Sequence, residues 1–324
     1  MKLSGGRSVL TLPGQNIRYF YICLFLALLP LPMILIEQGF IATGSGLSVL
    51  DGRGSGQITL YGASLFFVVV YSRYVAQDSP FFYLDLYRKA WSRALLGFLT
   101  FCLVSCFLSI IGFVMTIGMN TVSYSPEAIS QLNQTHLKRL LISLPIASVL
   151  ALVEELMFRG FLMRYLRWKV TPLTTVLAIV FASLVFAFVH NLPDPVSWIE
   201  PRNIRLFIGL FILGCVLCVV YISTGSLLCS VGLHAGFLFM ENARNYTKVL
   251  QLSNAEWFMV DGQDVRTSPI AWGLFCFIGL AVYLNRRRLH PIFAVEKQVM
   301  ASSDVTEPIG SGSSEHTMAA RAGG

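Results

Sequence analysis

The sequence has little charge for its length. Only 13% of its 324 residues are Asp, Glu, Lys or Arg, whereas 55% are hydrophobic. Soluble globular domains carry roughly 25% charged residues, so about half that fraction leaves too little polar surface to keep a chain of this size in water. This composition excludes an ordinary soluble domain and predicts a protein whose solvent is the lipid bilayer.

Signatures of several other protein classes are also missing. The seven cysteines are odd in number and lie in apolar stretches, which excludes a disulfide framework. Cys215 and Cys218 would share a helix face, but no His or acidic residue accompanies them, so packing is favoured over zinc binding. The glycines within 44–54 lack the Gly-Lys-Ser/Thr of a phosphate loop. The net charge of +7 is spread over short clusters rather than one basic stripe, so no nucleic-acid partner is expected.

What is present is a series of apolar stretches. A helix needs about 20 apolar residues to cross roughly 30 Å of hydrocarbon. On this criterion the sequence predicts an all-α polytopic membrane protein with about eight transmembrane helices. The seventh is the weakest, because it is short and contains His234. The predicted spans are 18–37, 57–76, 94–118, 140–162, 173–192, 204–223, 226–242 and 269–285.

The distribution of Lys and Arg predicts how these spans are oriented. The two termini and the even-numbered connections carry about twice as many basic residues as the odd-numbered connections. Cytoplasmic loops are the ones enriched in Lys and Arg. We therefore predict an integral, multi-pass protein of a bacterial inner (plasma) membrane with both termini in the cytoplasm.

Ionisable residues in three of the predicted spans form a candidate set. Glu154, Glu155 and Arg159 lie in the fourth span, His190 ends the fifth, and His234 lies in the seventh. Charged groups in hydrocarbon are costly and therefore mark functional sites by default. Glu155 and Arg159 are four residues apart on one helix face, so we expect them to form an ion pair. Glu154 lies about a quarter turn away, which leaves it able to face a cavity as a general base.

Two chemistries are open to this set of residues. One Glu and two His side chains are a possible zinc set with an open fourth position. Alternatively, Glu154 activates a water molecule while His190 and His234 orient it and stabilise the developing oxyanion without a metal. The residues alone favour neither. A packing or interfacial role for the histidines and a proton relay in a transporter are the other interpretations.

These segments resemble the CAAX protease and bacteriocin-processing (CPBP/Abi) family of intramembrane endopeptidases. The family's first motif is two glutamates, three residues and an arginine, and its second is a phenylalanine four residues before a histidine. Its third is a histidine on a later helix, followed after three residues by Asn or Asp. The matching residues are Glu154, Glu155 and Arg159 for the first motif, Phe186 and His190 for the second, and His234 for the third.

The third motif is incomplete, because Leu238 stands where the family has Asn or Asp. In the family this residue helps to shape the site for water and the oxyanion. Glu241 lies seven residues after His234, almost on the same helix face, and Asn242 lies eight after it. Three outcomes are open: one of these two side chains substitutes, the site works without a substitute, or this member is inactive.

The resemblance implies a membrane enzyme that hydrolyses a peptide bond of a membrane-associated or exported protein. Glu154 would activate water and His190 and His234 would assist, with no metal cofactor required and zinc as the alternative. The partners would be a protein or peptide substrate and the lipid bilayer. The competing functions are a catalytically lapsed immunity or scaffold protein of the same fold and a proton-coupled transporter. The residues expected to support the site are Glu155, Arg159, Phe186, Glu241 and Asn242.

Four segments follow from these assignments. They are an N-terminal three-helix membrane region at 1–137, a catalytic core at 138–245 on helices four to seven, a loop and last transmembrane helix at 246–288, and a disordered cytoplasmic tail at 289–324. The fourth span starts and the fifth ends on the extracytoplasmic side, so a site around His190 is expected to open toward that face. Such an opening favours exported or membrane-anchored substrates over prenylated ones.

Overall fold

The computed structural model describes the central and C-terminal helices of the chain. The predicted span 18–37 and most of the span 57–76 lie outside the described residues, as does the predicted tail beyond Phe293. The described residues are 91–118, 122–124, 126–166, 171–191, 201–247, 250–252 and 265–293, with a few single positions between 62 and 73.

Within these ranges the chain is almost entirely helical. The exception is a pair of short antiparallel strands, in which Val122 lies opposite Leu252. The elements in order are α4 (Trp91–Gly118), β1 (Val122–Tyr124), α5 (Pro126–Ser130), α6 (Gln134–Glu155), η3 (Leu156–Leu162), α7 (Met163–Leu166), α8 (Pro172–Asn191), α9 (Pro201–Thr224), α10 (Leu227–Thr247), β2 (Leu250–Leu252), η5 (Val265–Thr267), α11 (Pro269–Leu284) and α12 (Arg286–Phe293).

Four helical stretches of the described chain are long and apolar enough to cross a membrane, and the bent pair α11 and α12 adds a fifth if counted as one span. The predicted seventh span forms α10, but α10 is not among these candidates. The total of eight spans therefore remains a prediction. The four candidates agree closely with the predicted third to sixth spans and cover Trp91–Met115, Gln134–Leu162, Pro172–His190 and Asn203–Thr224.

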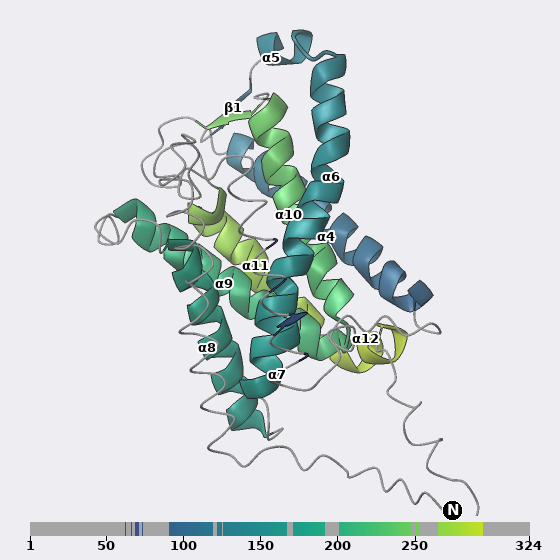
Figure 1. The fold of residues 1–324 in the computed structure, drawn as a ribbon. Coiled ribbons are helices and arrows are strands. Elements are labelled where there is room, and N and C mark those ends of the chain that lie inside the picture. Colours follow the sequence, from purple (N-terminus) through teal and green to yellow (C-terminus); the bar gives the residue numbers. More distant parts are fainter. Residues whose placement is uncertain are drawn as a thin grey trace, which may run out of the picture.

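Helix α10 lies among the other helices and packs on α4, α6 and α9 (Figure 1). Two glycines bring its backbone close to α4. A Cβ atom at Gly232 would overlap the backbone of Phe98, and one at Gly236 would overlap Ser105 and the carbonyl of Cys102. Small residues four apart allow such close approach of membrane helices. This packing fixes the position of His234, which lies between the two glycines.

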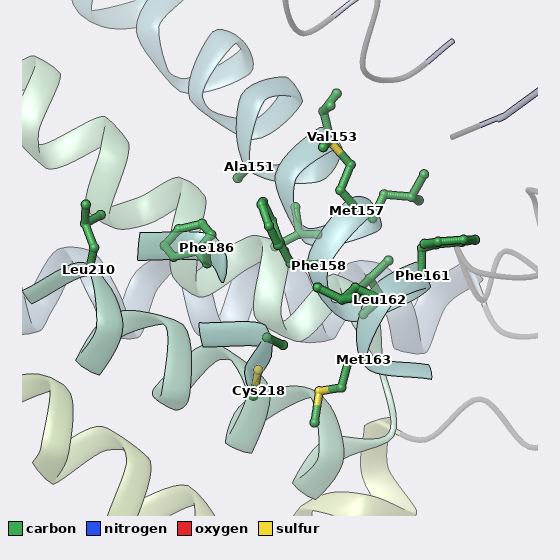
Figure 2. Packing of buried hydrophobic residues seen from close by; sticks show 14 of the residues in the cluster. Ala151, Val153, Met157, Phe158, Phe161, Leu162, Met163, Phe186, Leu210 and Cys218 are labelled. Atoms are coloured by element: carbon green, nitrogen blue, oxygen red, sulfur yellow. The ribbon is translucent and has the colours of Figure 1, made fainter. Parts of the chain in front are cut away.

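Large apolar residues fill the space between η3, α8 and α9. The rings of Phe158 and Phe186 meet edge to face, with centroids 5.2 Å apart (Figure 2). All seven residues of η3 are buried, and this segment is a π-helix that widens the turn directly after Glu155. Single turns of π-helix inside longer helices occur frequently at functional sites. This buried segment directly follows the two glutamates in the chain and holds the end of α6 in place.

Candidate active site

Glu154 and two histidines from three helices converge in the structure. Oε2 of Glu154, in the last turn of α6, lies 3.5 Å from Nε2 of His190 on α8 and 3.7 Å from Nε2 of His234 on α10. Glu154 and His234 are buried, whereas the side chain of His190 is 23% exposed. The three residues that the sequence analysis selected as catalytic are thus brought together.

Glu155 lies at the centre of a second, fully buried set of contacts. Its Oε1 accepts hydrogen bonds from Arg159 at 2.8 Å and from Nδ1 of His234 at 3.0 Å, and its Oε2 accepts one from the Ser230 hydroxyl. An ionised carboxylate only accepts hydrogen bonds, so Nδ1 of His234 carries the proton and Nε2 faces Glu154. The predicted ion pair is present, and Glu155 also orients one of the histidines.

Arg159 connects this set to the neighbouring helices. Besides its bond to Glu155, the guanidinium donates to the Gly214 carbonyl of α9 at 3.2 Å. It also stacks on the ring of Phe186 at 4.6 Å from the centroid, while its Nε lacks a hydrogen-bond partner among the described residues. The positive charge is therefore held by a carboxylate, a carbonyl and an aromatic face, which together lower the cost of burying it.

Phe186 orients the other histidine. Nδ1 of His190 lies 2.8 Å from the carbonyl oxygen of Phe186, one turn earlier on α8. Because a carbonyl only accepts, this bond places the proton on Nδ1 and directs Nε2 toward Glu154. The Phe186 ring also lies against the rings of both histidines, with centroid distances of 4.5 Å to His190 and 6.0 Å to His234. Phe186 therefore fixes the ring positions of both histidines.

A cavity of about 370 Å³ lies beside Glu154, His190 and His234, which form part of its wall. Helices α4, α9 and α11 complete the wall with mainly apolar side chains, and Ser109, Arg266 and Ser268 add polar groups. The cavity extends along α10 from His234 to Asn242. It therefore runs toward the end of the bundle where α10 ends and β1 lies (Figure 1).

The residues around the incomplete third motif line the same cavity. Leu238, Glu241 and Asn242 all belong to its wall. The Glu241 carboxylate accepts hydrogen bonds from Arg244 and, at 3.3 Å, from the Asn245 amide. Asn242 lies two turns, or about 12 Å, along α10 from His234. Both polar residues are thus placed along the cavity, farther along α10 than Leu238, rather than beside Glu154.

The zinc alternative requires at least three ligand side chains around one point. Among the described residues, no group of three or more His, Cys, Asp or Glu side chains has a geometry that could hold a metal ion. Nδ1 of His234 is engaged by Glu155 and Nδ1 of His190 by a backbone carbonyl, so Nε2 is the nitrogen of each ring that faces Glu154.

Three features of the site lie outside the sequence-based prediction. Ser230, one turn before His234, donates a hydrogen bond to Glu155. Because Ser230 lies four residues before His234 on the same helix face, this spacing could have identified it as a candidate. The spacing of Gly232 and Gly236 signals the close packing of α10. Residues of α4 and α11 also line the cavity, but these helices lie outside the 138–245 segment. None of the sequence motifs predicts that they line it.

Comparison with known proteins gives one match. A family model described as type II CAAX prenyl endopeptidase Rce1-like matches residues 136–240, which include Glu154, His190 and His234. No curated protein and no solved structure matches the chain. The family is one of CAAX proteases, and together with the apolar helices the match identifies an integral membrane protein. Residues 136–240 therefore match a domain of the CAAX protease and bacteriocin-processing family.

Proposed function

We propose that the protein is an intramembrane endopeptidase that hydrolyses a peptide bond of a membrane-associated or exported protein with water activated by Glu154. The convergence of Glu154, His190 and His234 beside a cavity carries this proposal. All three side chains line this cavity, from which a water molecule can reach each of them. The family match supports a protease.

Glu154 serves as the general base in this proposal. It takes one proton from the water molecule as the water oxygen bonds to the substrate carbonyl carbon, and the carbonyl oxygen becomes the oxyanion. The carbon–nitrogen bond then breaks, and Glu154 returns its proton to the leaving amine. The products are a new carboxyl terminus and a new amino terminus, and Glu154 is a carboxylate again.

The two histidines have different roles. Nδ1–H of His190 is held by the Phe186 carbonyl, so its Nε2 accepts a hydrogen bond from the attacking water. His234 donates Nδ1–H to Glu155, a carboxylate that stabilises positive charge on the ring. When both of its ring nitrogens carry a proton, His234 can also donate Nε2–H, which faces Glu154, to the oxyanion.

The substrate enters from the end of the bundle where α10 ends. The cavity follows α10 for eight residues, or about 12 Å, which an extended peptide covers with about four residues. The segment that is cut must therefore be unfolded. The Arg286–Arg288 cluster lies at the opposite end of α11, and the positive-inside rule therefore supports an entrance on the extracytoplasmic side.

Purified protein in proteoliposomes, incubated with a mixture of membrane-anchored peptides, tests this function. Mass spectrometry of the peptide termini is expected to show new ends with the wild-type protein and none with Glu154→Gln, which keeps the size of the side chain but removes the base. Glu315→Gln, far from the site in sequence, is the matched control and should cleave like the wild type. Undiminished cleavage by Glu154→Gln would contradict the proposed mechanism.

A catalytically lapsed membrane immunity or scaffold protein is the second candidate, and Leu238 is the observation that favours it. This apolar side chain lines the cavity at the position where the family has Asn or Asp. Leu238→Asn separates the two candidates. If the wild type cleaves nothing and Leu238→Asn gains cleavage, catalysis has lapsed in this member; if the wild type cleaves, the enzyme functions without that amide.

A further inference from the structure

Helix α12 forms a basic surface at the opposite end of the bundle from the cavity (Figure 1). It starts at Arg286, two residues after α11 ends at Leu284, and the two helices are bent by 79°. Since α11 is an apolar helix that enters the bilayer, a helix that leaves it at this angle runs along the membrane surface.

One face of α12 is fixed to the bundle. Phe293 is buried, and its ring meets Phe101 of α4 edge to face with centroids 5.9 Å apart. Leu289, one turn earlier, packs against the same apolar cluster. A Cβ atom at Gly97 would lie 3.3 Å from the Phe293 ring, so the fit is tight. α12 is therefore held in one place.

The remaining surface of α12 carries three exposed arginines, Arg286, Arg287 and Arg288. The guanidinium of Arg286 donates to the Tyr283 carbonyl at 3.0 Å and stacks over the Tyr283 ring at 4.1 Å. Leu284, which is 66% exposed, directly precedes this cluster. Exposed leucine contacts lipid hydrocarbon, whereas tyrosine and arginine prefer the level of the headgroups. Their adjacency is therefore expected where a helix crosses the boundary between hydrocarbon and headgroups.

We propose that α12 binds the phosphate headgroups of anionic phospholipids in the leaflet that surrounds this end of the bundle. Guanidinium groups pair with phosphate oxygens through two parallel hydrogen bonds. The position of the cluster at the end of an apolar helix favours a lipid phosphate over a soluble anion. This surface lies away from the site residues and does not depend on the proposed peptidase activity.

The test compares lipid binding by three full-length proteins: the wild type, R287Q/R288Q, and K138Q/R139Q. Lys138 and Arg139 are exposed on α6 at the other end of the bundle, so both variants lose the same charge. Phosphatidylglycerol is titrated into phosphatidylcholine nanodiscs, and retained lipid is measured by native mass spectrometry. Each basic residue near an anionic surface contributes roughly fivefold, so R287Q/R288Q should bind phosphatidylglycerol about 25-fold more weakly, while K138Q/R139Q stays near wild type.

Equal binding by all three proteins would overturn the proposal. An equal loss of binding in both variants would also overturn it, because such a loss would depend on net charge rather than on a site at α12. Melting of each variant in phosphatidylcholine alone checks the fold. If R287Q/R288Q does not fold, the single variants R287Q and R288Q replace it. Each should then weaken binding about fivefold, and unchanged binding in both would equally refute the site.

Discussion

The buried ion pair between Glu155 and Arg159 gives a quantitative test of the site through protein stability. Arg159→Met removes the guanidinium that bonds to Glu155 and leaves a buried carboxylate without its cation. Breaking a buried pair from one side costs about 3–5 kcal/mol of unfolding free energy. Glu155→Gln together with Arg159→Met removes both charges, and the Gln oxygen can still accept from His234. The double variant should therefore lie within about 2 kcal/mol of the wild type.

The unfolding free energies are measured by titrating SDS into mixed micelles and following tryptophan fluorescence. Arg139→Met is the matched control, because Arg139 is exposed on the same helix, α6, and its loss should change stability by less than about 0.5 kcal/mol. A cost below about 1 kcal/mol for Arg159→Met, or a double variant as unstable as the single one, would refute the reasoning. The double variant should still cleave more slowly, since Nδ1–H of His234 then donates to a neutral amide rather than to the Glu155 carboxylate.

Three further predictions concern neighbouring features. Ser230→Ala removes a hydrogen bond to the buried Glu155 carboxylate and should lower the free energy of unfolding by about 2 kcal/mol. It should also lower kcat about tenfold with little change in KM. An unchanged kcat would show that Ser230 does not contribute to the site. Gly236→Leu should cost at least about 2 kcal/mol in the same SDS titration, because a side chain there meets α4, and wild-type stability would mean that the helices are not in close contact. Treatment with 1,10-phenanthroline should leave peptide cleavage unchanged, and inhibition that added zinc reverses would favour the metal alternative.

Several parts of the fold could be predicted because a membrane imposes a simple rule on the sequence. Helices α4, α8 and α9 are predominantly apolar, so stretches of about 20 residues locate them within a few positions. The same rule is less informative for α10. This helix carries polar groups and packs on α4, α6 and α9, so its apolar content does not by itself say whether it spans the bilayer.

Within the candidate site, contacts along one helix could be predicted from the sequence, whereas contacts between helices could not. Spacing within a helix correctly placed Glu155 beside Arg159, because four residues bring side chains onto one face. The bond from Ser230 to Glu155 joins α10 to α6 across 75 positions of sequence; spacing within α10 puts Ser230 on the face of His234 but does not identify its partner on α6. The π-helix after Glu155 likewise depends on tertiary packing rather than on a local sequence signal.

The central claim, that Glu154 activates water for peptide hydrolysis, is tested most directly in cells that carry either the wild-type protein or Glu154→Gln at equal abundance. The amino and carboxyl termini of all membrane and exported proteins are compared by mass spectrometry. We predict that one class of precursor stays uncut only with Glu154→Gln, which would also identify the substrate. Identical termini in both cells, with Glu154→Gln accumulating normally, would contradict the claim.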